Sequence, residues 1–240
     1  MNLELQRYLQ SINTPWGMLF YKMVWQQIGD VSGLKILDFG SGFGVTSNHY
    51  AKENKVLAVE PNMDMSENRI CEYLYEQING SKEILKTFDN ETFDLIICHN
   101  VLEYMEEKER LLQEFDRLIR KKGTISIVKH NHIGRIMSKV VFENKLEEAI
   151  ELLNNGESYS ENFGRIDYYN INQLLEKFKG LQINKILGLR TFWGLQQNNE
   201  AKYEDNWAEK MLEVELKVSD MDEFKNCAFF HHVFISKNEK

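Results

Sequence analysis

The chain has 240 residues, which is enough for one substantial hydrophobic core. Hydrophobic residues make up 42% and charged residues 28% of it, as in folded globular proteins, which argues against a disordered chain. The net charge of −8 argues against a protein that binds nucleic acid mainly by bulk electrostatics. A local basic patch remains compatible with it.

Targeting and redox signals are absent from the sequence. No apolar stretch approaches the roughly 20 residues that cross a bilayer, and the N-terminal residues lack a signal-peptide pattern, so we expect a cytoplasmic protein without a membrane partner. Cys71, Cys98 and Cys227 contain no CxxC pair, so neither a disulfide framework nor a zinc site is expected.

Residues 1–30 show two helical patterns at three-to-four spacing. The second pattern is rich in aromatic residues, namely Trp16, Phe20, Tyr21 and Trp25. We expect this N-terminal segment to fold over a pocket as a lid that excludes water. The alternative, that these aromatic residues are ordinary core, stays open.

Residues 34–130 alternate between apolar strand-like runs and helical patterns. Strands are predicted at residues 34–39, 55–60, 83–85, 93–100 and 124–130, with helices at 45–53 and 63–78 and a long amphipathic helix that contains Leu111 to Ile119. This alternation implies right-handed crossovers and a doubly wound parallel sheet. Ligands bind to such sheets at the carboxyl ends of the strands.

The remainder is less regular. A helical pattern over 132–153 precedes a polar loop at 154–164, and a helix is expected after Asn170. Strands at 181–192 and 228–236 flank another helix around residues 203–211. We therefore expect a main domain at 31–240 that carries a helical insertion at about 132–170.

The stretch "ILDFGSGFG" (36–44) ends a predicted strand in a glycine-rich turn. Gly40, Gly42 and Gly44 permit positive φ angles and close approach of a ligand to the backbone. The dinucleotide pattern GxGxxG would require glycine where the chain has Val45, and the lysine of a P-loop is missing, which weakens both of these nucleotide readings.

Two acids flank this turn. Glu60 ends the next strand, where a carboxylate can accept hydrogen bonds from a ribose diol. Asp38 lies beside the turn, where a carboxylate favours a cationic, amine-bearing ligand over a pyrophosphate.

These residues resemble motif I of class I S-adenosylmethionine-dependent methyltransferases, with Glu60 as the acid after the second strand. "FDLIICHNVLEYM" (93–105) and "RLIRKKGTISIV" (117–128) are similar to the segments around the family's fourth and fifth strands. The resemblance implies a mostly parallel seven-stranded α/β sheet, with helices on both faces and an antiparallel last strand. It also implies S-adenosyl-L-methionine as the cofactor.

The resemblance further implies a set of cofactor contacts. Gly40, Ser41 and Gly42 would face the methionine part, Glu60 the ribose and Met63 the adenine, and Asp38 and Gly44 belong to the same turn. Thr87 and Phe88 are candidates for adenine contact, and His99 corresponds to a cofactor-contacting histidine. A packed histidine bonded to backbone is the alternative for His99.

Several segments are more specifically similar to bacterial tRNA 5-carboxymethoxyuridine methyltransferases, which methylate a carboxylate on a wobble uridine. They are "CHNVLEYM" (98–105), "ISIVKHNHIGRIMSKVV" (125–141) and "GLRTF" (188–192). Phe20 stands where that family has a cofactor-contacting arginine, with Lys22 two residues further on. Candidate substrate-binding residues are Lys22, Glu103, Asn131, Arg135 and Arg190.

Three functions follow as alternatives. The first is a methyltransferase acting on tRNA, the second a methyltransferase that modifies O or N of a small metabolite, and the third a non-catalytic nucleotide-binding module. A carboxylate acceptor is already ionised at neutral pH, so no catalytic base is assigned. His130 and His132 lack the spacing and the nearby carboxylate of a metal site, so no metal is expected.

Overall fold

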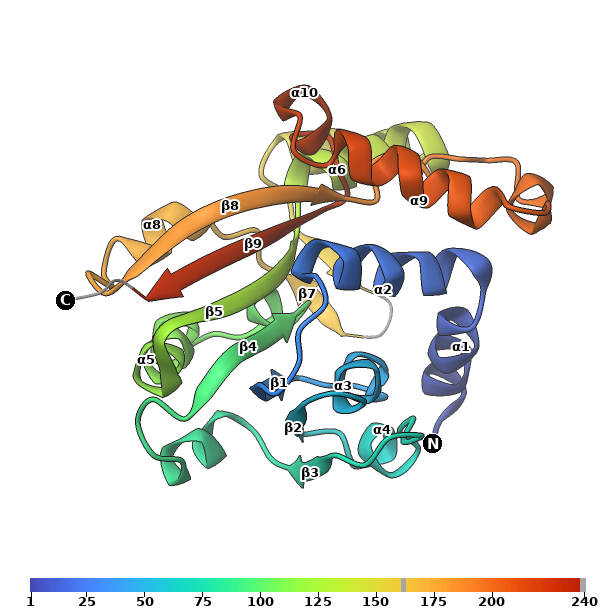
Figure 1. Cartoon of the computed structure of the whole chain (residues 1–240). Helices are drawn as coiled ribbons and strands as arrows, with labels where there is room; N and C mark the ends of the chain where they lie inside the picture. The colour runs from blue at the N-terminus through green and yellow to red at the C-terminus, as the bar shows by residue number, and fades with distance from the viewer. Residues whose placement is uncertain (161–162, 238–240) are drawn as a thin grey trace.

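A computed structural model describes residues 1–160 and 163–237, and a twisted sheet forms its centre (Figure 1). In these residues seven strands follow the order β3-β2-β1-β4-β5-β9-β8. The strands are β1 (Lys35–Phe39), β2 (Lys55–Glu60), β3 (Glu76–Asn79), β4 (Phe93–His99), β5 (Ile119–His130), β8 (Leu181–Leu189) and β9 (Phe230–Lys237). The first five pair in parallel, and β9 is antiparallel to both β5 and β8. The predicted fold class is confirmed.

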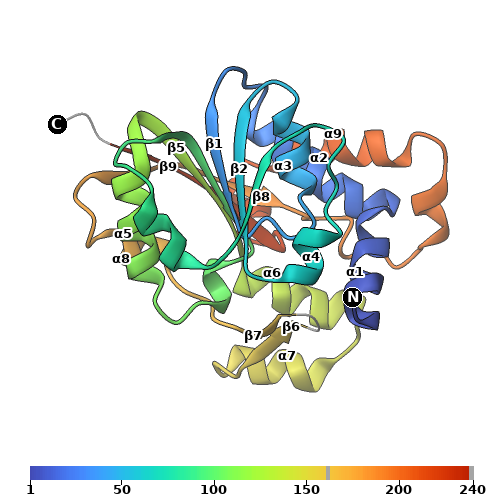
Figure 2. The same ribbon diagram turned by 90° about the horizontal axis from the view of Figure 1, so that it is seen from below.

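Helices cover both faces of the sheet (Figure 2). On one face pack α1 (Leu3–Ile12), α2 (Pro15–Ile28), α3 (Val45–Ala51), α4 (Met63–Glu67) and α9 (Trp207–Val218); on the other pack α5 (Lys108–Leu118) and α8 (Ile171–Leu175). Side chains alternate along β1, so that Leu37 joins the core beneath α5 whereas Ile36 joins the core on the α3 side.

Shorter elements follow β4 along the chain. They are α6 (His132–Met137), a π-helix (Ser138–Phe142), α7 (Leu146–Leu153) and α10 (Asp222–Lys225), with 3₁₀ turns at Leu102–Tyr104 and Glu200–Tyr203. The strands β6 (Ser158–Ser160) and β7 (Gly164–Ile166) form a hairpin. The predicted polar loop at 154–164 thus contains strand structure, and its residues 161–162 lie outside the described residues. No helix among the described residues is long and apolar enough to cross a bilayer.

The N-terminal helices form for local reasons. Asn2 caps α1, because its Oδ1 accepts from Leu5 N at 2.9 Å. Thr14 caps α2 in the same way with Gly17 N at 3.1 Å, and Pro15 occupies the first helical position. Gly29, with φ of 88°, ends α2.

The third strand differs from the sequence prediction. Residues 83–85 belong to a 3₁₀ helix (Lys82–Thr87), and the strand is the preceding β3. A three-residue segment with two apolar residues, of which Leu85 is fully buried, does not distinguish a strand from a turn. Strand β3 lies at the sheet edge, so its residues stay partly exposed and carry no apolar run. The helix predicted at 63–78 is only α4, because the chain must return to the sheet at residue 76.

Gly134→Ala is expected to destabilise the protein by about 1–3 kcal/mol, because a Cβ at this position in α6 would lie 2.1 Å from the backbone oxygen of Ala228. Urea unfolding measures the change. Gly80→Ala is the matched control, since its Cβ would meet Ile84 at an ordinary 3.5 Å. Equal stability of the two variants would contradict the prediction.

Candidate active site at the carboxyl ends of the strands

A cavity of about 640 Å³ opens where β1, β2, β4 and β5 end. We call it the carboxyl-end cavity. Its floor comes from the turns after these strands, and its other walls from α1, α2, β9 and the β6–β7 hairpin. The lining residues are Tyr8, Phe20, Tyr21, Asp38, Phe39, Gly40, Ser41, Gly42, Phe43, Thr46, Glu60, Pro61, Met65, Ser81, Lys82, Glu83, His99, Asn100, Val101, Tyr104, Met105, His130, Ser160, Phe163 and Phe230. Its volume suits a nucleoside-sized ligand.

The three glycines of the turn are required for different reasons. All have positive φ, at 78°, 56° and 71° for Gly40, Gly42 and Gly44. A Cβ on Gly40 would lie 2.3 Å from Val101 Cγ2, whereas a Cβ on Gly42 would meet no atom within 4 Å. Gly44 does not line the cavity: its Cβ would lie 2.0 Å from Tyr75 Oη, so this glycine makes room for packing.

Glu60 shapes the same turn. Its Oε2 accepts from Gly42 N at 2.8 Å and its Oε1 from Asn62 N at 2.9 Å. The side chain is only 6% exposed, and burial raises the pKa of its carboxyl. The two hydrogen bonds lower this pKa but do not offset the effect of burial. Each oxygen retains a lone pair for a further donor.

Asp38 lies beneath the turn and is 4% exposed. Its Oδ2 accepts from Ser47 Oγ at 2.6 Å. Burial raises the pKa of Asp38 to about 6, and the Ser47 hydrogen bond opposes the rise. Among the described residues Asp38 forms no ion pair, and a buried carboxylate that lines a cavity in this way favours a positively charged ligand.

His99 lines the cavity at the end of β4, as the resemblance implies. Its Nε2 lies 2.8 Å from Ser126 Oγ. Burial lowers the pKa of His99 to about 3, so the imidazole is neutral. The next residue, Asn100, has φ of 55° and thereby turns the chain sharply away from the strand.

The structure places the three predicted adenine contacts outside the carboxyl-end cavity. Met63 is 60% exposed and lies outside the cavity, whereas Met65, one helical half-turn on, is buried and lines it. Thr87 and Phe88 also lie outside, with Phe88 packed edge-on against Phe93. The residues that follow β3 and do line the cavity are Ser81, Lys82 and Glu83. The sequence did not indicate them because the third strand was predicted at residues 83–85, so the turn after it was expected further along the chain.

Three proposed substrate contacts do not line the cavity. Lys22 is exposed outside it. Glu103 is buried behind it, where its Oε1 accepts from His130 N at 3.1 Å and burial raises its pKa to about 7. Asn131 is structural, because its Nδ2 donates to the carbonyl groups of Asn226 and Ala228 at 2.9 and 2.8 Å.

Arg135 and Arg190 are brought together, but not at the cavity wall. Their guanidinium carbons lie 5.7 and 4.6 Å from the ring centroid of Phe229, whose ring in turn contacts the cavity residue His130. The Arg135 head lies 3.7 Å from Glu143. Burial lowers the pKa of Arg190 to about 10, with a smaller contribution from the positive charge of the nearby Arg135.

The N-terminal helices supply an aromatic wall. Phe20 and Tyr21 line the cavity, together with Tyr8 of α1, whereas Trp25 stacks on His49 at 3.7 Å outside it. The aromatic pattern predicted this location for Phe20 and Tyr21. Tyr8 belongs to the first helical pattern of residues 1–30, and no sequence signal separates such a residue from core.

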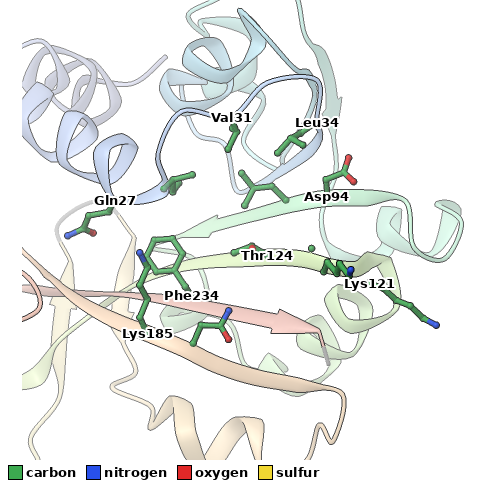
Figure 3. A pocket seen from close by; sticks show the side chains of 13 residues that line it. Gln27, Val31, Leu34, Asp94, Lys121, Thr124, Lys185 and Phe234 are labelled. Atoms are coloured by element: carbon green, nitrogen blue, oxygen red, sulfur yellow. The ribbon is translucent and has the colours of Figure 1, made fainter. Parts of the chain in front are cut away.

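A second groove lies near the amino ends of β4 and β5, between these strands and the end of α2 (Figure 3). Asp94, Thr124, Lys185 and Phe234 are among its walls. It is therefore at the opposite end of the strands from the glycine turn. Among residues 1–160 and 163–237, no group of three or more His, Cys, Asp or Glu side chains is placed to hold a metal ion.

Known proteins are similar to parts of this chain. A family model described as "Methyltransferase domain" matches residues 37–127. Thiol S-methyltransferase TMT1B of Mus musculus is 28% identical over 119 residues, 45% of this chain and 48% of that protein. The chain spans about half the length of the curated relatives it matches.

Solved structures show the same fold at low identity. A candidate S-adenosylmethionine-dependent methyltransferase from Listeria monocytogenes has a TM-score of 0.64 at 13% identity, covering 92% of this chain and 98% of that one. The plantazolicin methyltransferase BamL, in complex with a triazolic desmethylPZN analog and SAH, has a TM-score of 0.56 at 14% identity, covering 98% and 88%. Residues 37–127 are therefore similar to a methyltransferase domain, within a chain that has the fold of class I S-adenosylmethionine-dependent methyltransferases.

Proposed function

We propose that the protein is a methyltransferase that uses S-adenosyl-L-methionine. The observation that carries the proposal is the convergence of Asp38, Gly42 and Glu60 on one wall of the carboxyl-end cavity. Asp38 supplies a negative charge for an ammonium group, Gly42 an open backbone surface and Glu60 acceptors for a ribose diol. The solved BamL structure, which has this fold, holds S-adenosylhomocysteine.

The residues present fit this cofactor. Two cavity residues, Ser41 and Asn100, carry buried oxygen atoms with no hydrogen-bond partner among the described residues. Such atoms are costly when left unpaired, and donors of a bound ligand would satisfy them. When bound, the cofactor supplies a sulfonium-activated methyl group, and the protein's part is to orient the donor and acceptor and to exclude water.

The geometry best supports a small, flat acceptor molecule. The cavity walls opposite the glycine turn are aromatic, with Phe20, Tyr104 and Phe230 from three different elements. Some cationic side chains that could attract tRNA are paired with acids: Lys139 lies 2.6 Å from Glu143 and Arg165 lies 3.1 Å from Glu157. The charges of these two pairs largely cancel at long range, so neither pair attracts a polyanion strongly.

A modified wobble uridine of tRNA is the second candidate acceptor. The sequence resemblance of "CHNVLEYM" and "GLRTF" supports it, and so does the pair of arginines on Phe229, next to His130. A carboxylate acceptor would need no general base and would gain from two nearby guanidinium groups.

Incubation with methyl-labelled S-adenosylmethionine separates the candidates. Bulk tRNA and a tRNA-free small-molecule extract are offered in parallel, with Asp38→Asn as the control that lacks the ammonium site. We expect label in the small-molecule fraction with the wild type only. Label in tRNA would favour the second acceptor. Absence of label from both fractions, under conditions where the cofactor is bound, would favour a non-catalytic module.

A further inference from the structure

A buried chain of hydrogen bonds runs from α2 to the cavity through three strands. Gln27 of α2 donates from Nε2 to the carbonyl oxygen of Gly188 in β8 at 3.0 Å, and its Oε1 lies 2.7 Å from His232 Nδ1. His232 Nε2 lies 2.7 Å from Ser126 Oγ, which lies 2.8 Å from His99 Nε2. Ser126 and His232 are fully buried, and Gln27 is buried under the same sheet face.

The sheet register explains how these side chains meet. In β9, His232 is paired with Val128 of β5, and His99 of β4 is paired with the same Val128. Ser126 is two residues away from Val128, so it points to the same face of the sheet. The imidazole rings of His99 and His232 lie 5.3 Å apart and nearly perpendicular.

The donor and acceptor of each hydrogen bond in this series follow from the Gly188 carbonyl at its end. A carbonyl oxygen only accepts, so the Gln27 amide must direct Nε2 to Gly188 and Oε1 to His232. Nδ1 of His232 must then carry a proton. Burial holds the pKa of His232 well below its usual range, so the ring is neutral and its Nε2 accepts from Ser126. The Ser126 hydroxyl donates its only hydrogen to His232 Nε2, so its oxygen accepts a hydrogen bond from His99 Nε2–H.

We infer that Gln27, Ser126 and His232 are positioning residues that hold His99 as the Nε2–H tautomer, so that its unprotonated Nδ1 accepts a hydrogen bond from the bound cofactor. The contact between His99 Nδ1 and the cofactor rests on the proposed function. S-adenosylmethionine offers donors of this kind in its ammonium, ribose hydroxyl and adenine amino groups. A histidine free to change tautomer would present a proton to those donors for part of the time and would bind them less well.

Nitrogen NMR of the protein labelled with ¹⁵N-histidine tests the first part without any ligand. The two tautomers give different ¹⁵N shifts, and His99→Gln and His232→Gln identify the signals. We expect Nε2 of His99 and Nδ1 of His232 to be the protonated atoms. A proton on Nδ1 of His99 in the wild type would overturn the inference. This measurement requires no substitution of Ser126 or Gln27.

Variants test the coupling and its effect on binding. Ser126→Ala removes the hydroxyl that is hydrogen-bonded to His99. Gln27→Met removes the amide that orients His232 and keeps an unbranched side chain. Each is expected to mix the His99 tautomers and to weaken S-adenosylhomocysteine binding about three- to tenfold by calorimetry. Ser236→Ala, in β9 but partly exposed and hydrogen-bonded to Asn184, is the matched control and should change neither.

The outcomes separate the two proposals. If the wild type fails to bind S-adenosylhomocysteine, the proposed function is wrong, while the tautomer measurement still tests the hydrogen-bond chain. If both variants fold and keep the wild-type tautomer, the positioning role is refuted. If they mix the tautomers but bind as tightly as the wild type, His99 does not contact the cofactor through Nδ1.

Discussion

Glu60→Ala is expected to weaken binding of S-adenosylmethionine about 100-fold or more, because two sets of charge-assisted hydrogen bonds are lost together. The carboxylate would no longer accept from the ribose, and the N–H groups of Gly42 and Asn62 would lose their acceptor. Calorimetric titration with S-adenosylhomocysteine and, separately, with adenosine measures the loss. Adenosine contains the ribose but not the methionine part, so it reports on Glu60 directly.

The matched control is Glu83→Ala. Glu83 also lines the cavity and carries the same charge, but it is exposed and accepts from the Ser81 hydroxyl. We expect a change of less than about threefold, as for an exposed charge. An equal effect of the two substitutions would show that the cavity responds to net charge and that Glu60 has no specific role.

The second large effect concerns pH. Burial raises the pKa of Asp38 to about 6, so in the free protein this side chain is mostly protonated below that pH. A bound ammonium group requires the ionised form. Affinity for S-adenosylmethionine should therefore rise as the pH rises through about 6 and then level off, with release of a proton on binding. Asp38→Asn should bind about 10- to 100-fold more weakly above pH 6 and lose most of this pH dependence.

Calorimetry across the pH range, in buffers of different ionisation enthalpy, measures both the affinity and the proton release. Asparagine is close in shape and can still accept from Ser47, so the fold should persist. Without ligand the sign for stability is opposite: the folded protein binds this proton more tightly than an unfolded chain, so stability falls as the pH rises from 3.8 through about 6. A pH profile unchanged in Asp38→Asn would assign the titration to another group.

The central strands could be predicted from sequence because burial on both faces produces continuous apolar runs. Strands β1, β2 and β4 lie where those runs are, and the glycine turn follows β1. Edge strand β3 could not be predicted in the same way, since its exposed side gives it the composition of a loop. The hairpin β6–β7 is too short to show an alternation.

The cofactor side of the site was more predictable than the acceptor side for a similar reason. Asp38, Gly40 and Glu60 line the cavity because they directly follow or end a strand, and strand ends fix position. Their role in binding remains a prediction. Residues on later turns depend on side-chain partners far away in sequence: Asn131 is used by the carbonyl groups of residues 226 and 228, and Arg190 turns onto Phe229.

The cavity has a floor that is fixed by the close packing of Gly40 against Val101, and a roof whose segments can be exchanged. The turns after β1 and β4 fit together so closely that a single methyl group would not fit between them, so neither can be reshaped alone. The roof is built by α1, α2 and the β6–β7 hairpin, all outside the domain matched at 37–127. A change of acceptor during evolution, or by engineering, would therefore come from replacing roof segments while the floor stays constant.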